Sequence, residues 1–183
     1  MAFALNLPKL SYSGVGAIDD AIATLSQQPV KRALVVTDKN LVELGLLDHL
    51  FDLLDQASID YELFDKVTPN PTATLVREGL SLYLEAGCDC FIAVGGGSPV
   101  DCAKAIRIVA ANSGDIVDYD GVGKVTQAGD FFIAINTTAG TAAEMTSNSV
   151  ITDEVRQVKM VIIDAKQIPC LLYTSDAADD TCC

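Results

Sequence analysis

Basic charge, histidine and tryptophan are scarce in this sequence of 183 residues. The 12 lysine and arginine residues stand against 25 acidic residues, which gives a formal net charge of -13, and tryptophan is absent. A chain with this charge repels nucleic acid and anionic membrane surfaces, so we expect neither as a partner. The single histidine, His49, excludes a multi-histidine metal site and leaves no Ser–His–acid constellation for hydrolase chemistry.

Long apolar segments and targeting signals are missing as well. No run approaches the ~20 apolar residues that cross a bilayer, and Met1–Pro8 lacks the charged region of a secretory signal. The six cysteines do not indicate a disulfide framework, because the chain is neither short nor visibly secreted. Cys88 and Cys90 have no second Cys/His cluster with which to complete a tetrahedral site. We therefore expect a cytoplasmic protein with no metal ligands in this chain.

What the sequence does contain is a regular alternation of apolar strands and amphipathic helices. The expected strands are 9–13, 33–37, 59–64, 90–94 and 131–135, and the expected helices cover 17–25, a broken stretch to 56, 72–86 and 98–112. Two further strands, 149–152 and 158–163, are expected to pair as a hairpin. This order is typical of βαβ units, so we predict an α/β fold with a mostly parallel sheet.

The segment from Cys170 to Cys183 differs from the rest of the chain. It shows no clear periodicity, and no partner element is expected for it. We predict one domain over residues 1–169, followed by a tail of foreign origin over residues 170–183. Genomic sequence beyond Pro169 would test this prediction.

The junction between the fourth strand and its helix is the strongest functional motif. Gly95, Gly96 and Gly97 lead into a helix that we expect to begin at Ser98, with Ser98 as its cap and Asp101 completing a capping box. A helix N-terminus over a turn without side chains favours a phosphate ligand, and a tight turn without a ligand is the alternative interpretation. The pattern is neither a P-loop nor the dinucleotide fingerprint G-x-G-x-x-G.

Polar residues at other strand ends each allow two interpretations. Asp38 follows a buried strand, where its carboxylate would either accept hydrogen bonds from ribose hydroxyls or cap the next helix. Thr137, Thr138 and Thr141 offer hydroxyls after another strand, but they suit a turn equally well. Asp101 and Lys104, three residues apart, either form a weak surface pair or have a functional role.

Four motifs stand in order along the chain: Pro69–Thr72, Gly95–Lys104, Ala134–Thr141 with Glu144–Thr146, and Ile151–Glu154 with Lys159–Asp164. Together they resemble the iron-containing (group III) alcohol dehydrogenases, over Met1 to about Pro169. Asn136 is similar to the branch with methanol dehydrogenases and threonine-dehydrogenase-like enzymes. The resemblance implies a Rossmann-like, dehydroquinate synthase-like N-terminal domain, to which an all-helical domain is added in the family.

The resemblance also implies a site for NAD in the cleft between the two domains. Asp101 and Lys104 match a functionally important pair, which we take as the candidate catalytic residues. The implied cofactor-binding residues are Asp38, Asn70, Gly95, Gly96, Gly97, Ser98, Thr137, Thr138, Thr141, Val150 and Lys159. Among these, Asp38 is expected to contact the adenosine ribose and to favour NAD over NADP.

The family's divalent iron is held by one aspartate and three histidines, all beyond the Val161–Asp164 segment, so the resemblance implies that these ligands are absent here. Metal lowers the pKa of the alcohol hydroxyl before hydride transfer. We therefore predict the NAD-binding half of an alcohol dehydrogenase (alcohol plus NAD to aldehyde or ketone plus NADH), inactive as this truncated chain. The full-length family is usually homo-oligomeric, with a small alcohol as substrate. A nucleotide-binding module that acts with a partner and a dehydroquinate-synthase-like lyase fragment remain as alternatives.

Overall fold

A six-stranded sheet forms the centre of the molecule. The computed structural model describes residues 7–138, 140 and 142–174. The strands lie in the order β1-β9-β6-β4-β2-β3, and all neighbouring strands are parallel. They are β1 (Leu10–Ser13), β2 (Arg32–Val36), β3 (Asp60–Phe64), β4 (Cys90–Gly95), β6 (Phe131–Asn136) and β9 (Leu171–Thr174). The predicted α/β fold with a mostly parallel sheet is confirmed.

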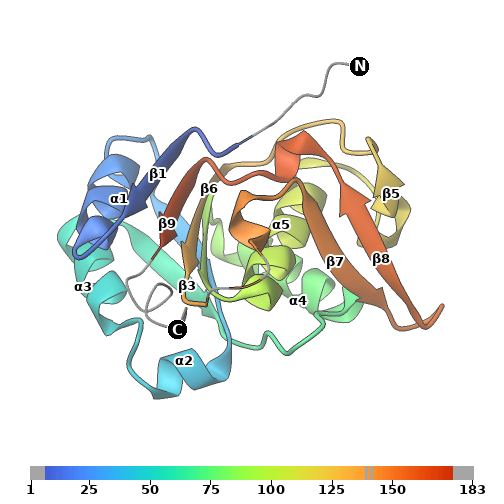
Figure 1. Ribbon diagram of the computed structural model, residues 1–183, viewed down its shortest axis with the longest axis horizontal. Helices are drawn as coiled ribbons and strands as arrows, with labels where there is room; N and C mark the ends of the chain where they lie inside the picture. Colours follow the sequence, from blue (N-terminus) through green and yellow to red (C-terminus); the bar gives the residue numbers. More distant parts are fainter. Residues whose placement is uncertain (1–6, 139, 141, 175–183) are drawn as a thin grey trace.

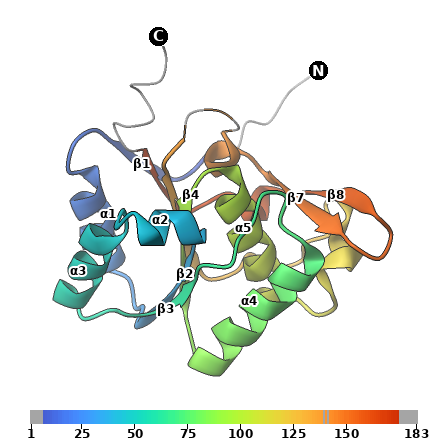
Figure 2. The same cartoon turned by 90° about the horizontal axis from the view of Figure 1, so that it is seen from below.

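Helices cover both faces of this sheet, as Figures 1 and 2 show. One face carries α1 (Ala17–Leu25), α2 (Lys39–Glu43) and α3 (Asp48–Gln56), and the other carries α4 (Ala73–Ala86) and α5 (Gly97–Ala111). Alternate side chains of each central strand enter different cores: Phe91 and Ala93 of β4 pack on the α4/α5 side, whereas Ile92 and Val94 pack on the α1/α3 side. The strands are therefore apolar along their whole length, because both of their faces are buried.

A second, three-stranded sheet packs against α5 on the side away from the main sheet (Figure 2). It consists of β5 (Gly121–Val122), β7 (Asn148–Asp153) and β8 (Val158–Ile163). The antiparallel pairing of β7 with β8 confirms the predicted hairpin. Because α5 lies between two sheets, residues 99, 100 and 102–109 of this helix are all buried.

Short 3₁₀ helices complete the described part of the chain: η1 (Ile116–Tyr119), η2 (Ala143–Met145) and η3 (Ala165–Gln167). In the ranges that the structure describes, no helix has both the length and the apolar character needed to cross a membrane.

The start of the C-terminal segment belongs to the main sheet. β9 inserts between β1 and β6, with Leu171 and Leu172 buried at 1% and 3% exposure. The expectation that this segment has no partner element is therefore wrong for residues 171–174. Three consecutive apolar residues here suffice for a strand that is buried on both faces. Residues 175–183 lie outside the described residues, and the foreign origin of the tail stays a prediction.

Candidate functional site

The carboxyl ends of three adjacent central strands lie side by side at one end of the main sheet. β6, β4 and β2 are neighbours in the sheet. β6 leads into a turn that contains Thr137 and Thr138 (the threonine turn), β4 leads into Gly95–Gly97 (the glycine turn), and β2 leads into Asp38. Connections diverge to opposite faces of the sheet at this point, since β2 is followed by α2 and β4 by α5 (Figure 2). Open α/β sheets bind ligands at such a divergence.

The glycine turn requires glycine for two different reasons. Gly95 has a φ of 138°, and a Cβ added there would lie 2.8 Å from Cγ of Pro99. Gly96 has an ordinary φ of -85°, but an added Cβ would lie 2.8 Å from Oγ1 of Thr138. Positive φ strains any residue with a side chain. The turn therefore brings bare backbone next to the threonine turn.

The α5 helix begins one residue earlier than we expected. Gly96 is its N-cap, and among the described residues no side chain accepts a hydrogen bond from the first turn of the helix. The expectations of a Ser98 cap and an Asp101 capping box are wrong, because with Gly97 already helical Asp101 lies more than a turn inside the helix. Its carboxylate turns to β7 instead, and Oδ2 accepts a hydrogen bond from the Val150 N–H at 3.0 Å. The first N–H groups of α5 are therefore left without a side-chain cap.

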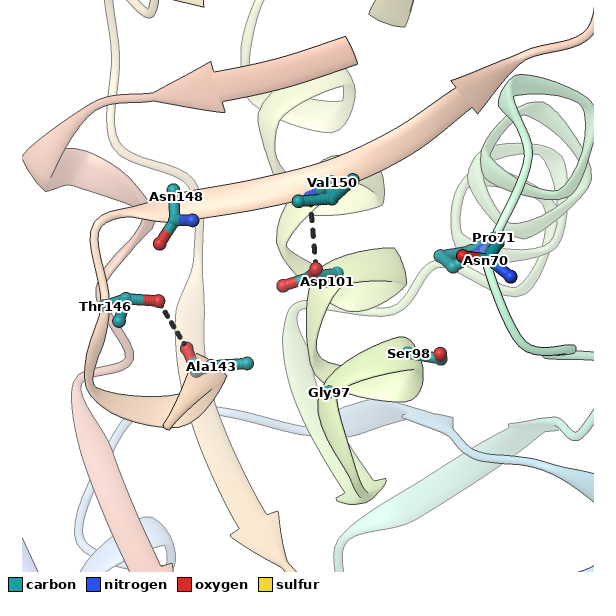
Figure 3. A pocket seen from close by; sticks show the side chains of 9 residues that line it. All are labelled: Asn70, Pro71, Gly97, Ser98, Asp101, Ala143, Thr146, Asn148 and Val150. Carbon is teal, nitrogen blue, oxygen red and sulfur yellow. Dashed lines mark hydrogen bonds between the residues drawn. The ribbon is translucent and has the colours of Figure 1, made fainter. Parts of the chain in front are cut away.

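A cavity of about 330 Å³ opens on one side of this helix start (Figure 3). Gly97, Ser98 and Asp101 come from α5, Asn70 and Pro71 from the loop before α4, and the remaining residues from η2, β7 and the segment between them. The lining residues are Asn70, Pro71, Gly97, Ser98, Asp101, Ala143, Thr146, Asn148 and Val150. We call this the first cavity. Most of its polar groups are uncharged, and Asp101 is its one ionisable residue.

A second cavity of about 370 Å³ opens on the other side of the same helix start. It is lined by Asp38, Lys39, Asn40, Val67, Thr68, Pro69, Gly96, Gly97, Ser98 and Pro99. Oδ1 of Asp38 accepts hydrogen bonds from the N–H groups of Asn40 (3.0 Å) and Leu41 (3.2 Å), so Asp38 is the N-cap of α2. The two interpretations of Asp38 are compatible, since the residue caps a helix and also borders a cavity.

A third, more apolar cavity of about 400 Å³ lies on the α1/α3 side of the sheet. Its lining residues are Ile18, Leu41, Leu46, His49, Leu50, Val94, Ile135, Thr137, Thr138 and Tyr173. Of these lining residues, Thr137 and Thr138 were predicted as site residues and the others were not. The tail residue Tyr173 could not be placed here from the sequence, because its strand was not expected.

Lys104 is completely buried and Asp101 is half-buried, so the interpretation as a weak surface pair is wrong. Nζ of Lys104 donates hydrogen bonds to the carbonyl oxygens of Ala143, Thr146 and Asn148 at 2.6, 2.7 and 2.9 Å. Burial raises the pKa of Asp101 to about 6, against the opposing effects of the Val150 N–H and the Lys104 charge. Burial also lowers the pKa of Lys104 to about 8, and the charges of Asp101 and Glu144 oppose this shift.

Two other predicted site residues, Lys159 and Gly95, are not among the residues that line the three cavities. Nζ of Lys159 donates to Oδ1 of Asn70 at 2.6 Å, so Lys159 holds a lining residue without lining a cavity itself. Gly95 shapes the turn, and its carbonyl accepts the Thr137 N–H at 3.1 Å. Thr141 lies outside the described residues.

Four residues that line the first cavity, Pro71, Ala143, Thr146 and Asn148, were not among the predicted site residues. Thr146 and Asn148 stand at or near the start of β7, and their backbone carbonyls are bound by Lys104. The signals in the sequence were the motifs Pro69–Thr72 and Glu144–Thr146, which contain Pro71 and Thr146, and the short polar run from Thr146 to Asn148.

Metal ligands are not gathered in the described ranges 7–138, 140 and 142–174, where no group of three or more His, Cys, Asp or Glu residues could hold an ion. His49 is exposed, and its Nε2 lies 3.4 Å from Oδ2 of Asp19. Burial raises the pKa of the Cys88 thiol to about 11 and that of Cys102 to about 12, which disfavours the thiolate that binds metal. These residues do not fit an iron site.

Comparisons with known proteins agree on one family. The sequence profile described as iron-containing alcohol dehydrogenase matches residues 8–174. Alcohol dehydrogenase 4 of Schizosaccharomyces pombe is 42% identical over 168 residues, which cover 92% of this chain and 40% of that protein. NAD-dependent methanol dehydrogenase of Bacillus methanolicus is 43% identical over 163 residues, covering 89% of this chain and 43% of that protein.

The fold comparison gives the same result. The crystal structure of a 1,3-propanediol oxidoreductase superimposes with a TM-score of 0.93 at 37% identity, covering 96% of this chain and 46% of the other. The chain thus spans less than half the length of each of these relatives.

Proposed function

The chain belongs to the iron-containing alcohol dehydrogenase family, and we propose that it is the NAD-binding part of an enzyme that oxidises an alcohol. The overall reaction is alcohol plus NAD to aldehyde or ketone plus NADH. The names of the methanol dehydrogenase and 1,3-propanediol oxidoreductase relatives support a small alcohol as the substrate. The cytoplasm is the compartment we expect for this chemistry.

The arrangement of two cavities around one helix start carries the NAD proposal. Gly97 and Ser98 line both the first and the second cavity, so the uncapped N-terminus of α5 lies between them. A dinucleotide has its two negative phosphates in the middle and a nucleoside at each end. The N-terminal N–H groups and the helix dipole suit the pyrophosphate, and the ribose of one nucleoside enters the cavity on each side.

Asp38 suggests which half of the dinucleotide enters which cavity. Both capping hydrogen bonds use Oδ1, and Asp38 lines the second cavity, so its carboxylate can meet a ribose there. A carboxylate accepts hydrogen bonds from ribose hydroxyls and repels a 2′-phosphate, so the adenosine half lies on this side and NAD is preferred over NADP. Leu41, next to Asp38, borders the apolar third cavity, which suits a flat base. The nicotinamide half then enters the first cavity.

Iron would act as a Lewis acid on the alcohol hydroxyl, but the residues described here do not provide its ligands. We therefore assign to this chain the binding and orientation of the nucleotide, not the activation of the alcohol. The 183-residue chain by itself is expected to bind NAD without oxidising alcohol.

Calorimetry of the chain with NAD, NADP and AMP tests this proposal. We expect saturable binding of NAD and weaker binding of NADP. The Ser98→Glu variant places a negative charge at the helix start, where it stabilises the helix but repels the pyrophosphate, so NAD binding is lost while stability is kept. Ser98→Ala is the matched control and retains binding. Lack of NAD binding by the folded wild-type chain contradicts the proposal, as does NADH production from alcohol and ferrous ion.

A further inference from the structure

Lys104 lies behind the wall of the first cavity rather than in it. We propose that its ammonium group is a positioning residue, which fixes the backbone of residues 143–148 and so sets the shape of the cavity that receives the nicotinamide half. The ligand part of this inference rests on the proposed function. The role of Lys104 in holding the wall does not.

All three N–H donors of the Lys104 ammonium group bind the protein backbone, so none is left to bind a ligand. An ammonium group has three donors, and all three reach carbonyl oxygens, those of Ala143, Thr146 and Asn148. The side chain is completely buried, at 0% exposure, and it does not line the cavity. This is the geometry of a structural contact. On this inference Lys104 positions the backbone, whereas the catalytic role that the resemblance implies stays a prediction.

The acceptors of Lys104 connect it directly to the cavity. The three residues whose carbonyls it binds all line the first cavity. Ala143 belongs to η2 (Ala143–Met145), Thr146 follows this short helix, and Asn148 begins β7. The Ala143 carbonyl also accepts the Thr146 N–H at 3.3 Å, a bond within this turn. The Lys104 ammonium group binds the carbonyls of all three residues, so it connects η2, the residues after it and the start of β7 at one point.

Asp101 makes a comparable contact between α5 and the backbone of β7. It lies three residues before Lys104 on α5, and its Oδ2 accepts the Val150 N–H (Figure 3). A helical spacing of three puts both side chains on one face. One face of α5 thus holds four backbone positions between Ala143 and Val150, three through carbonyls and one through an N–H.

Arg107, one turn further along α5, provides a matched control within the same helix. It is also buried, at 4% exposure, and its guanidinium also donates to three carbonyls: Gly129 (2.8 Å), Asp130 (2.6 Å) and Lys166 (2.8 Å). None of these acceptors lines a cavity at the glycine turn. Lys104 and Arg107 therefore differ in what they hold, not in burial or in the kind of contact.

The test compares Lys104→Met with Arg107→Met in the 183-residue chain, under conditions where circular dichroism shows both to be folded. We expect Lys104→Met to lose NAD affinity by about tenfold or more and to keep its AMP affinity, because AMP uses the Asp38 side. We expect Arg107→Met to keep both affinities. Equal losses for both ligands in Lys104→Met, or the same NAD loss in Arg107→Met, would show a general effect on stability and overturn the inference.

Hydrogen exchange separates this inference from the proposed function. Lys104→Met is expected to reduce protection in residues 143–150, and Arg107→Met around residues 129–130 and 166. This result holds even if the wild-type chain fails to bind NAD, in which case only the proposed function fails. Unchanged protection over residues 143–150 in Lys104→Met contradicts the positioning role.

Two further measurements keep the inference testable if Lys104→Met does not fold. Lys104→Gln retains two N–H donors. It is expected to lose NAD affinity and protection from hydrogen exchange in the same places as Lys104→Met, but to a smaller extent. In the wild-type chain, the ¹⁵N resonance of the Lys104 ammonium is expected to show hydrogens that exchange slowly. An ammonium that exchanges as fast as those of exposed lysines would refute the three-carbonyl contact.

Discussion

Replacing Asp101 by asparagine makes the cost of burying its charge measurable. Burial raises the pKa of Asp101 from 3.8 to about 6 in the folded chain. The folded chain therefore holds this proton more tightly than the unfolded chain. The resulting stabilisation is complete below about pH 4 and is lost as the pH rises through about 6.

The size of this effect follows from linkage. A rise from 3.8 to about 6 corresponds to about 3 kcal/mol in total, of which about 2 kcal/mol falls between about pH 4.5 and about pH 7. Asp101→Asn removes the ionisation and keeps an oxygen for the Val150 N–H. The free energy of unfolding of the wild type, minus that of the variant, should therefore fall by about 2 kcal/mol over this range.

Urea unfolding at a series of pH values measures this difference. Asp52→Asn, at an exposed aspartate of α3, is the control, because it removes the same charge from the surface. It shows how the removal of an exposed charge alone changes the free energy of unfolding at each pH. If the Asp101→Asn difference falls no more steeply with pH than this control, the Asp101 carboxylate is solvated in the folded chain and the reasoning from burial is wrong.

Three other predictions concern the turn, the nucleotide and the last strand. Gly95→Ala should lower the free energy of unfolding by about 2 kcal/mol in thermal unfolding, because of its positive φ, whereas Gly96→Ala should cost less. Asp38→Asn keeps the cap of α2 but loses the charge; calorimetry should show about tenfold tighter NADP binding relative to NAD, and an unchanged ratio would contradict the ribose contact. Deleting residues 170–183 removes two buried leucines of β9 and should cost at least about 4 kcal/mol in urea unfolding; unchanged stability would show that β9 is dispensable.

The central part of the fold could be predicted because its signals are local. Strands such as β4 are apolar on both faces, and α4 ends at Gly87, whose φ of 66° is of the kind that glycine adopts readily. β9 escaped prediction because its three apolar residues are too few to show a period. Only its neighbours β1 and β6, far away in the sequence, define it as a strand.

The site was predictable in its parts but not in its contacts. The glycine turn and Asp38 were placed at the correct edge of the sheet, since strand ends can be located from apolar runs. The start of α5 was misplaced because Ser98 is a better cap by composition than Gly96, while the close approach of Thr138 to position 96 is not visible in the sequence. The burial of Lys104 depends on carbonyls about 40 residues away, and no local pattern reports them.

The contacts of Lys104 have a consequence for how this site varies in evolution. Lys104 binds only backbone oxygens, and every residue type carries such an oxygen. The side chains at positions 143, 146 and 148 can therefore be exchanged without removing the bonds that hold the wall. A library randomised at these three positions should yield many folded variants with altered ligand preference. A single lysine that binds only the backbone thus leaves the side chains in front of it free to change.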